Sequence, residues 1–420
     1  MMATITIIPN LLSGNIHIPP SKSLSHRAVI CAALANGTSC IKGLIFSDDI
    51  TATIDAMKAL GTEISQEKDS VLIRSNGSLT PQKDIIDCCE SGSTLRFLIP
   101  LALTNHSITF TGRGKLIERP LDTYYKIFDE QQIAYQTTQG NLPLSVTGQL
   151  KPGYFRLRGD ISSQFITGLL FTLPRLESNS KINLTTPLES QGYIDLTLTM
   201  LERFGIHVTN NDYQEFIIPG NQRYTSQNYH VEGDYSQAAF WLAAGLIGSS
   251  VCCLDLNPHS VQGDKVIIDI LNKLGGNITF GTNSITATPS KTSGIEINAA
   301  QCPDLVPILA VLAAVSEGTT HIVQAGRLRL KESDRLHAIT QELNKLGADI
   351  HEGSDFLTIQ GRKELTGGIV DSWNDHRIAM ALAIASLRCH ESVTIQNSSC
   401  VNKSYPDFWK DFAELGGKIK

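Results

Sequence analysis

A short pattern recurs along this 420-residue chain at intervals of about 70 residues. Each copy has a large apolar residue, a Gly, two variable positions and a β-branched residue, and a degraded copy at 131–133 lacks the Gly. Self-similarity at a fixed period shows that a chain is built from repeated supersecondary units. The sequence therefore predicts six repeats that together account for the whole chain. The intact copies are Leu60–Ile64, Phe204–Val208, Leu274–Ile278, Leu346–Ile350 and Leu415–Ile419.

Every repeat carries the same series of local patterns. A mostly apolar helix comes first, and a short β-branched run follows it, as at 107–111 and 319–323. A second, amphipathic helix ends at the recurring pattern, where Gly suits a left-handed helix cap. Two strands then alternate around polar turn residues, as at 64–73, 206–218 and 349–359. The apolar helices are expected at 27–35, 96–103, 165–173, 238–246, 305–315 and 378–387.

The number and size of the repeats indicate two globular domains. Most solenoid repeats have roughly 20–50 residues, so this period is too long for them. A chain of 420 residues is also too long for a single hydrophobic core. Three repeats per domain is the natural division. The alternative is an ordinary α/β protein in which Leu-Gly recurs by chance, and we disfavour it because the spacing and the flanking patterns both repeat.

Composition argues against several classes of protein. A hydrophobic content of 41% supports a sizeable core, and a net charge of −6 argues against nonspecific nucleic-acid binding. No apolar run approaches the roughly 18 residues that would span a bilayer. The start, Met1–Pro9, lacks the charged and apolar regions of a signal peptide and the Arg and Ser of a transit peptide. Nine Cys without a C-x-x-C pair indicate reduced thiols in a cytoplasm.

A polar cluster precedes or begins the apolar helix of each repeat. Ser and Asp at such positions are ordinary helix N-caps when they are taken singly. Cations there are unusual because they oppose the helix dipole, yet the sequence places Lys22, Arg27, Arg96 and Arg377 at these starts. An anion held between the cations and the helix amides would account for them. The clusters are 20–27, 90–96, 160–164, 232–237, 303–304 and 374–377.

The loops after the short strands carry further cations. Lys331 and Arg335 stand four residues apart, which would place them on one face of a helix. Glu332 and Asp334 beside them are ordinary salt-bridge partners. If the loops and helix starts faced one cleft, this acidic chain would concentrate its cations there, so we expect substrates with several negative charges. The loop cations are Arg119, Arg329, Lys331, Arg335 and Lys403.

Several familiar cofactor and catalytic motifs do not occur in the sequence. It has no phosphate loop and no G-x-S-x-G elbow, and the segment 112–114 is too short for a dinucleotide fingerprint. The His residues lack the spacing of metal ligands. We therefore expect neither a metal nor an organic cofactor. Phe240 and Trp241, which follow the fourth cluster, are expected in the core.

Taken in order, six segments of the chain resemble those of the EPSP synthase (3-phosphoshikimate 1-carboxyvinyltransferase) family, and the resemblance covers essentially the whole chain. It implies the α/β class and a two-domain inside-out α/β barrel of six βαβαββ units, three per domain. One domain would be 18–228. The other would combine 1–17 with 229–420, so that the N-terminal strand closes it. The segments are PSKSLSHR at 20–27, SGSTLR at 91–96, SSQF at 162–165, LKESDRL at 330–336, DHRIAM at 375–380 and KSYPD at 403–407.

The resemblance also implies transfer of the enolpyruvyl group of phosphoenolpyruvate to the 5-hydroxyl of shikimate 3-phosphate, a step of chorismate and aromatic amino-acid biosynthesis. The expected partners are these two small molecules, and neither nucleic acid nor a membrane is expected to bind. The protein is expected to be a monomer in the cytoplasm. The implied catalytic residues are Asp304, Glu332 and Lys22. The implied ligands of shikimate 3-phosphate are Lys22, Ser23, Arg27, Ser162, Ser163, Gln164, Ser190, Tyr193, Asp304 and Lys331. Those of phosphoenolpyruvate are Lys22, Gly92, Arg119, Gln164, Arg335, His376, Arg377 and Lys403.

Physical chemistry supports the implied catalytic pair independently. The reaction deprotonates an alcohol and protonates an alkene carbon, so it needs two groups in opposite protonation states. Asp304 as base and Glu332 as acid would need environments that separate their pKa values. A cation such as Lys331 beside Asp304 would favour the carboxylate there. Clustered cations would also stabilise the several negative charges of the two substrates.

Two positions depart from the family pattern. Glu90 and Arg327 stand where the family often has Asn. Glu90 would bring a negative charge to the anion site unless it pairs with Arg96 or faces away. Neither position is therefore included among the expected site residues.

Two other functions compete with this interpretation. The first is the enolpyruvyl transferase that acts on UDP-N-acetylglucosamine, which shares the fold but carries a Cys in the loop before its Arg-Pro. The corresponding loop here, 112–120, has no Cys. The second is a non-catalytic anion-binding protein on the same scaffold. The chain keeps Lys22, Asp304, Glu332 and Arg377, so we disfavour that alternative.

Overall fold

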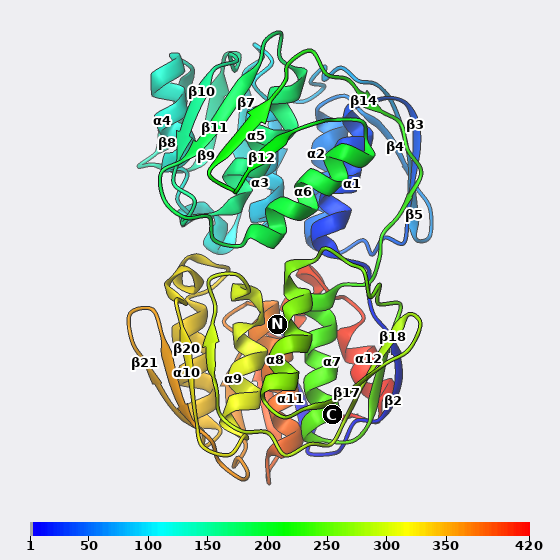
Figure 1. Ribbon diagram of the computed structural model, residues 1–420, viewed down its shortest axis with the longest axis vertical. Helices are drawn as coiled ribbons and strands as arrows, with labels where there is room; N and C mark the ends of the chain where they lie inside the picture. Colours follow the sequence, from blue (N-terminus) through cyan, green and yellow to red (C-terminus); the bar gives the residue numbers. More distant parts are fainter. Residues whose placement is uncertain (1–2) are drawn as a thin grey trace. The chain divides into compact units, whose positions relative to one another are not determined.

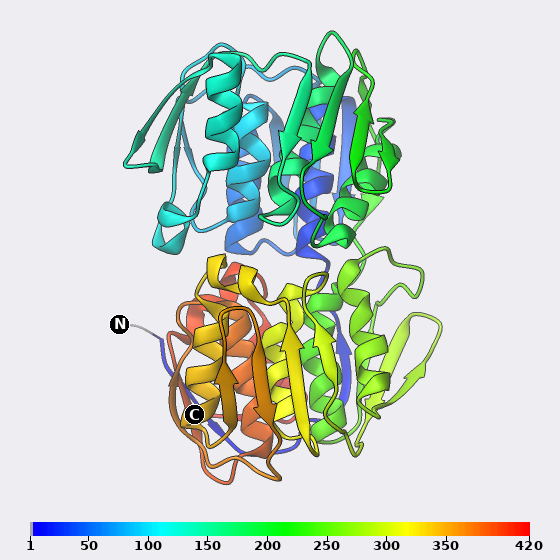
Figure 2. The ribbon, with the colours of Figure 1, turned by 60° about the vertical axis from the view of Figure 1, so that its left-hand side comes forward.

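The structure, a computed structural model, describes residues 3–420 as two compact units. The N-terminal unit is the continuous stretch 20–231, and the C-terminal unit combines 3–19 with 232–420. Within each unit the helices run side by side in the interior and the strands lie around them (Figures 1 and 2). Met1 and Met2, which are part of the segment 1–9 considered above for signal and transit peptides, lie outside the described residues.

Each repeat begins with a helix that is buried almost all round. These helices consist mostly of Ala, Leu, Ile, Val and Phe, and a helix that is apolar on every face is stable only inside a core. In the C-terminal unit the three pack against one another, and the core includes Phe240 and Trp241, both fully buried as predicted. The six predicted helices are confirmed as α1 (Lys22–Leu34), α3 (Gly92–Leu101), α5 (Ser163–Thr172), α7 (Tyr235–Ile247), α9 (Val306–Ala314) and α11 (His376–Ala385).

The second helix of each repeat is amphipathic and ends at the recurring pattern. Gly61, Gly205 and Gly347 follow three of these helices with φ values of 101°, 81° and 88°, the left-handed geometry expected of the caps. Gln132 in the degraded copy takes the same geometry, with φ 57°, although it has a side chain. The repeat therefore persists in the backbone where the Gly is missing. The helices are α2 (Asp48–Ala59), α4 (Asp122–Gln131), α6 (Gln191–Arg203), α8 (Ile267–Lys273), α10 (Arg335–Lys345) and α12 (Phe408–Glu414).

Six small sheets surround the helices. The strands of the N-terminal unit are β3 (Ala35–Lys42), β4 (Glu63–Gln66), β5 (Ser70–Asn76), β6 (Ile85–Asp87), β7 (Ile108–Thr111), β8 (Ala134–Thr138), β9 (Asn141–Thr147), β10 (Tyr154–Leu157), β11 (Ser180–Leu184), β12 (Thr209–Asn211), β13 (Glu215–Ile218), β14 (Tyr224–Thr225) and β15 (Tyr229–His230). Those of the C-terminal unit are β1 (Ile5–Ile8), β2 (Gly14–His17), β16 (Val251–Leu254), β17 (Asn277–Phe280), β18 (Ser284–Thr288), β19 (Glu296–Asn298), β20 (Thr319–Val323), β21 (Asp349–Glu352), β22 (Leu357–Gln360), β23 (Gly368–Asp371), β24 (Val393–Gln396) and β25 (Lys418–Ile419).

The sheets share one strand order. A linking strand pairs in parallel with the strand that follows the buried helix, and a hairpin completes the sheet in antiparallel fashion, as in β6-β7-β9-β8 and β19-β20-β22-β21. The start of the chain fills two places in this scheme. Strand β1 pairs with β24 and β25, and β2 lies parallel to β16. The predicted α-β-α-β-β repeat with a linking strand is therefore confirmed. Separately, none of the helices within residues 3–420 is long and apolar enough to cross a membrane.

Candidate active site

The starts of α1 and α2 meet at a salt bridge in the N-terminal unit. Ser21 caps α1 through its side chain. Lys22, the first residue of that helix, donates from Nζ to Asp49 Oδ2 at 2.8 Å. Both side chains are mostly buried, so the carboxylate fixes the position of the ammonium group. Asp49 lies in the first turn of α2, where an acidic residue is ordinary, so it was not predicted as a site residue.

Arg27 is buried deeper in α1 than predicted. It is the sixth residue of the helix, and Arg96 is the fifth residue of α3. Both residues were expected at helix starts, and this prediction is wrong. The Arg27 guanidinium donates to the carbonyls of Ser23 at 2.7 Å and Tyr193 at 2.9 Å, and to Thr197 Oγ1 at 2.9 Å. Burial lowers its pKa to about 10. Arg27 thus holds Ser23 and Tyr193, two expected ligands from different repeats, in one place.

Gln164 joins the starts of α3 and α5. Its Oε1 accepts from Arg96 Nη1 at 2.8 Å, and its Nε2 donates to Ser93 Oγ at 3.0 Å. Ser162 caps α5 by accepting from the Gln164 N–H at 3.3 Å, and Ser163 is the first residue of that helix. Ser190 precedes α6 in the left-handed conformation, with φ 58°. Hydroxyls and amides of this kind at helix starts suit a phosphate group.

A missing side chain lets Arg119 approach α3. A Cβ at Gly92 would lie 2.6 Å from Arg119 Nη1, so a larger residue at this position would displace the guanidinium. Arg119 follows η1 (Gly114–Glu118) and is almost completely buried. Glu90, one of the two departures from the family pattern, lies against the same short helix, since a Cβ at Gly114 would be 2.5 Å from its Oε2.

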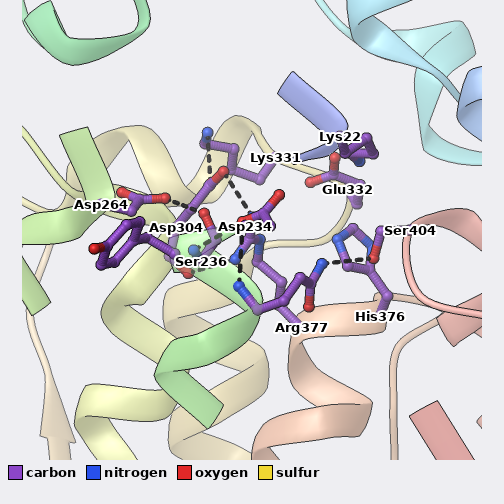
Figure 3. Close-up of polar contacts among 12 residues, drawn as sticks. Lys22, Asp234, Ser236, Asp264, Asp304, Lys331, Glu332, His376, Arg377 and Ser404 are labelled. Atoms are coloured by element: carbon purple, nitrogen blue, oxygen red, sulfur yellow. Dashed lines mark hydrogen bonds and ion pairs between the residues drawn. The ribbon is translucent and has the colours of Figure 1, made fainter. Parts of the chain in front are cut away.

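Three cations surround one carboxylate in the C-terminal unit. Asp304 lies in η4 (Pro303–Leu305), directly before α9. Its Oδ1 accepts from Lys331 Nζ at 3.0 Å and from Arg335 Nη1 at 2.9 Å, and its Oδ2 lies 3.2 Å from Arg377 Nη2. Figure 3 shows the side chains of Lys331 and Arg377 pointing toward Asp304. Burial opposes the charged form, but the cations, Arg377 foremost, outweigh it and hold the pKa of Asp304 well below its usual range.

Arg335 is the most buried cation of this cluster, with a side chain only 1% exposed. It donates to Asp304, to Glu332 Oε2 at 2.7 Å and to Asp375 Oδ2 at 2.7 Å. The predicted shared helix face of Lys331 and Arg335 is wrong, because Lys331 follows η5 (Gly326–Leu330) whereas Arg335 begins α10. The two cations meet at Asp304 instead of along one helix.

Asp375 organises the start of α11. It caps this helix by accepting from the Arg377 N–H at 2.9 Å, and it also accepts from Ser333 Oγ at 3.1 Å. His376 next to it is 1% exposed. Lys403 ends η7 (Ser398–Lys403), and its Nζ donates to the Asn374 carbonyl at 2.6 Å. Asp375 lies inside the DHRIAM segment but was not predicted as a site residue, because a lone Asp at a helix start is an ordinary cap.

Asp264 is a further acidic group that the sequence did not reveal. It follows β16 in the fourth repeat, is buried, and accepts a hydrogen bond from Ser236 near the start of α7 (Figure 3). Burial and the charge of Asp304 raise its pKa to about 6. Asp304 and Asp264 therefore form a pair of neighbouring carboxyl groups whose pKa values are pushed apart. We expected such a separation for Asp304 and Glu332.

This raised pKa predicts a pH-dependent effect of Asp264→Asn. Because the pKa is higher in the folded protein, the protonated carboxyl group of Asp264 contributes fully to the free energy of unfolding below pH 3.8. This contribution is lost as the pH rises through about 6. The uncharged amide avoids this loss. The variant should gain on the order of 1–3 kcal/mol relative to the parent protein between pH 4 and pH 7, measured by denaturant unfolding. Asp269→Asn, at an exposed position in α8, is the control and should show no such trend.

No group of His, Cys, Asp or Glu that could hold a metal ion is found in the described part of the chain. All nine cysteines are free thiols. Burial raises the pKa of Cys31, Cys88 and Cys253, which makes these thiols poor nucleophiles.

Six α/β repeats with cations, hydroxyls and a cation-bound carboxylate at their helix starts define a class of two-unit proteins that act on multiply charged anions. Comparison with known proteins assigns the family. The family model of EPSP synthase (3-phosphoshikimate 1-carboxyvinyltransferase) matches residues 7–412. A 3-phosphoshikimate 1-carboxyvinyltransferase of Clostridium novyi is 58% identical, over 100% of this chain and 98% of the relative. One from Clostridioides difficile is 52% identical with the same coverage.

A solved structure supports the same assignment. The EPSP synthase of Acinetobacter baumannii superposes with a TM-score of 0.82 at 27% identity, over 99% of each chain. The chain therefore belongs to the EPSP synthase family, which is a family of enzymes. The predicted family and fold class are both confirmed.

Proposed function

We propose that this protein transfers the enolpyruvyl group of phosphoenolpyruvate to the 5-hydroxyl of shikimate 3-phosphate and releases phosphate. The observation that carries the proposal is the carboxylate of Asp304, held ionised by Lys331, Arg335 and Arg377. The reaction removes a proton from a hydroxyl and adds one to an alkene carbon; loss of phosphate with a proton then restores the alkene. Relatives at 52–58% identity carry the name of this activity.

The roles follow from charge and geometry. Asp304, as a carboxylate, would accept the hydroxyl proton, and Lys331 would hold the same hydroxyl through its ammonium group. Glu332 would exchange a proton with the transferred carbons. The pair Arg335 and Arg377 would neutralise the phosphate and carboxylate of phosphoenolpyruvate, because guanidinium groups match such anions in two-point geometry. Lys22 would add a further cation to the charge that develops in the transition state.

The remaining residues form two sets. Ser23 and Arg27 would hold the shikimate carboxylate, and Arg27 already orders the backbone on either side of it. The phosphate group of shikimate 3-phosphate would be held by Ser162, Ser163 and Ser190, and Gln164 and Tyr193 would lie beside the ring of this substrate. The proposed phosphoenolpyruvate ligands are Lys22, Gly92, Arg119, Gln164, Arg335, His376, Arg377 and Lys403.

Phosphate release tests the proposal directly. The purified protein should release phosphate from phosphoenolpyruvate when shikimate 3-phosphate is supplied. Release with UDP-N-acetylglucosamine instead would establish the competing enolpyruvyl transferase, and no release with either acceptor would favour the non-catalytic alternative. A mass spectrum of the acceptor, heavier by one enolpyruvyl group, identifies the product.

We further propose that the two compact units are functional domains, because the proposed ligands of each substrate come from both. Binding of the anionic substrates would then draw the two sets of cations together. Small-angle scattering with and without shikimate 3-phosphate should show a smaller radius of gyration in the complex. The same measurement gives the molecular mass, for which we expect a monomer. An unchanged radius at saturating ligand contradicts this domain closure.

The nine free thiols fit a reducing cytoplasm, which is the location that we propose for this protein.

Arg27→Ala should weaken binding of shikimate 3-phosphate. Losing a charged hydrogen-bond partner costs about 1.5–3 kcal/mol, which corresponds to roughly a 10- to 150-fold higher KM. Arg27 also packs over Phe97 at 5.2 Å, so the variant should unfold more easily. Titration calorimetry at a temperature where the variant is folded separates the two effects. A folded variant with unchanged affinity would remove Arg27 from the substrate site.

A further inference from the structure

The turn before α11 has an unusual backbone. Trp373 and Asn374 both lie in the left-handed region, with φ values of 55° and 52°. The Asp375 N–H donates to the Ser372 carbonyl at 2.9 Å, so residues 372–375 form a tight turn with two left-handed central residues. Such turns favour Gly and Asn, and a bulky residue such as Trp is disfavoured there. Other contacts must therefore hold Trp373 in place.

Glu342 on α10 supplies these contacts. Its carboxylate is completely buried and accepts from the Trp373 indole Nε1 at 2.8 Å and from the Asp371 N–H at 3.0 Å. Asp371 in turn accepts from the Trp373 N–H at 2.6 Å through Oδ1. Lys345 donates to both oxygens of Glu342 at 2.9 Å and balances the buried charge. Trp373 as a whole is 37% exposed, so this hydrogen bond fixes a side chain that packing leaves partly free.

The same helix also holds the other end of the turn. Arg335 begins α10 and bonds Asp375, whereas Glu342 lies seven residues later, on the same helix face. The turn is thus held on one side through Asp375 and on the other through Asp371 and Trp373. The Asn374 carbonyl between these two anchors accepts from Lys403 Nζ. The turn also leads directly into His376 and Arg377.

We propose that Glu342 and Trp373 are positioning residues for phosphoenolpyruvate. They hold the turn whose Asn374 carbonyl orients Lys403 and whose end starts the helix of His376 and Arg377. This inference rests on the proposed function, since those three residues are proposed ligands. It adds two residues that lie outside the six segments of the family resemblance and outside both proposed ligand sets.

Trp373→Phe tests the inference with little risk to folding, because it removes one N–H and keeps an aromatic ring. The KM for phosphoenolpyruvate should rise about 10-fold, because small misplacements of binding groups have effects of this order. The KM for shikimate 3-phosphate should stay unchanged. Glu342→Gln should act in the same direction and more strongly. A merely structural loss would lower the active fraction and leave both KM values alone.

Tyr213→Phe is a matched control. Tyr213 is also left-handed, with φ 55°, and its hydroxyl donates to the Asp195 carboxylate at 2.7 Å, and neither residue is a proposed ligand. This variant should leave both KM values unchanged. If Trp373→Phe and Glu342→Gln behave like the control, the inference is overturned.

Lys403→Ala distinguishes failure of the inference from failure of the proposed site. If this variant leaves the KM for phosphoenolpyruvate unchanged, the proposed ligand set is wrong, whatever Trp373 does. If Lys403→Ala raises that KM and Trp373→Phe does not, only the positioning role is wrong. In the double variant the KM for phosphoenolpyruvate should rise by less than the product of the two single rises, since Trp373 acts partly through Lys403.

Discussion

Asp304→Asn and Glu332→Gln should each lower turnover by about 10²–10⁴-fold while shikimate 3-phosphate still binds, because both residues are proposed to transfer protons. Both replacements keep the size of the side chain and remove its ability to exchange a proton. Single-turnover measurements and calorimetric titration of the same samples give the chemical step and the affinity. A nearly intact turnover in either variant would remove that residue from catalysis.

The alternative for these residues is a structural one, in which Asp304 caps a helix and Glu332 is a salt-bridge partner. Glu332 does pair with Arg335, but the residue before α9 is Leu305, whose side chain makes no cap. Asp334 is a real cap, because it accepts from the His337 N–H at 3.1 Å at the start of α10. Asp334→Asn is therefore the control: melting temperature should fall by the equivalent of about 1 kcal/mol or less, with turnover almost unchanged.

Arg335→Met should produce a large loss of stability. The guanidinium is buried and bonds Asp304, Glu332 and Asp375 at once. Its removal leaves three carboxylates without their shared cation, and breaking a buried ion pair from one side costs about 3–5 kcal/mol. Equilibrium unfolding in denaturant measures this free energy. Activity should be lost as well, because Arg335 is a proposed ligand of phosphoenolpyruvate.

Arg329→Met provides the comparison for that experiment. Arg329 also pairs with two carboxylates, those of Asp334 and Glu352, but its side chain is 31% exposed. Exposed ion pairs are worth less than about 1 kcal/mol, so this variant should unfold almost like the parent. Equal losses in the two variants would show that burial does not determine the cost.

The local structure of each repeat could be predicted from the sequence because the signals are local. Apolar runs predicted the buried helices, and Gly in the recurring pattern predicted the left-handed ends of the second helices. Gln132 shows that the geometry holds even where the signal is weak. The N-terminal strand that closes the C-terminal unit was expected only through the family resemblance, since nothing in residues 5–17 indicates with which distant strands they pair.

The pairing inside the site could not be predicted in the same way. Arg335 bonds Asp375 from another repeat, and Asp264 lies near Asp304 although they belong to different repeats. Such contacts depend on how the buried helices pack, which a single sequence does not specify. The same limit explains the error at Lys331, where spacing predicted one continuous helix and the chain instead breaks between η5 and α10.

The closing of the C-terminal unit by strand β1 has a consequence for synthesis on the ribosome. Residues 20–231 are continuous and can complete their fold while the rest of the chain is still being made. Strand β1 is made before residues 20–231, yet it pairs with β24 and β25, which are made after them. Until β24 and β25 have been made, its Ile side chains and open edges have no partner, a condition that favours aggregation and chaperone binding. A strand that is made before the whole N-terminal unit is thus completed only after that unit.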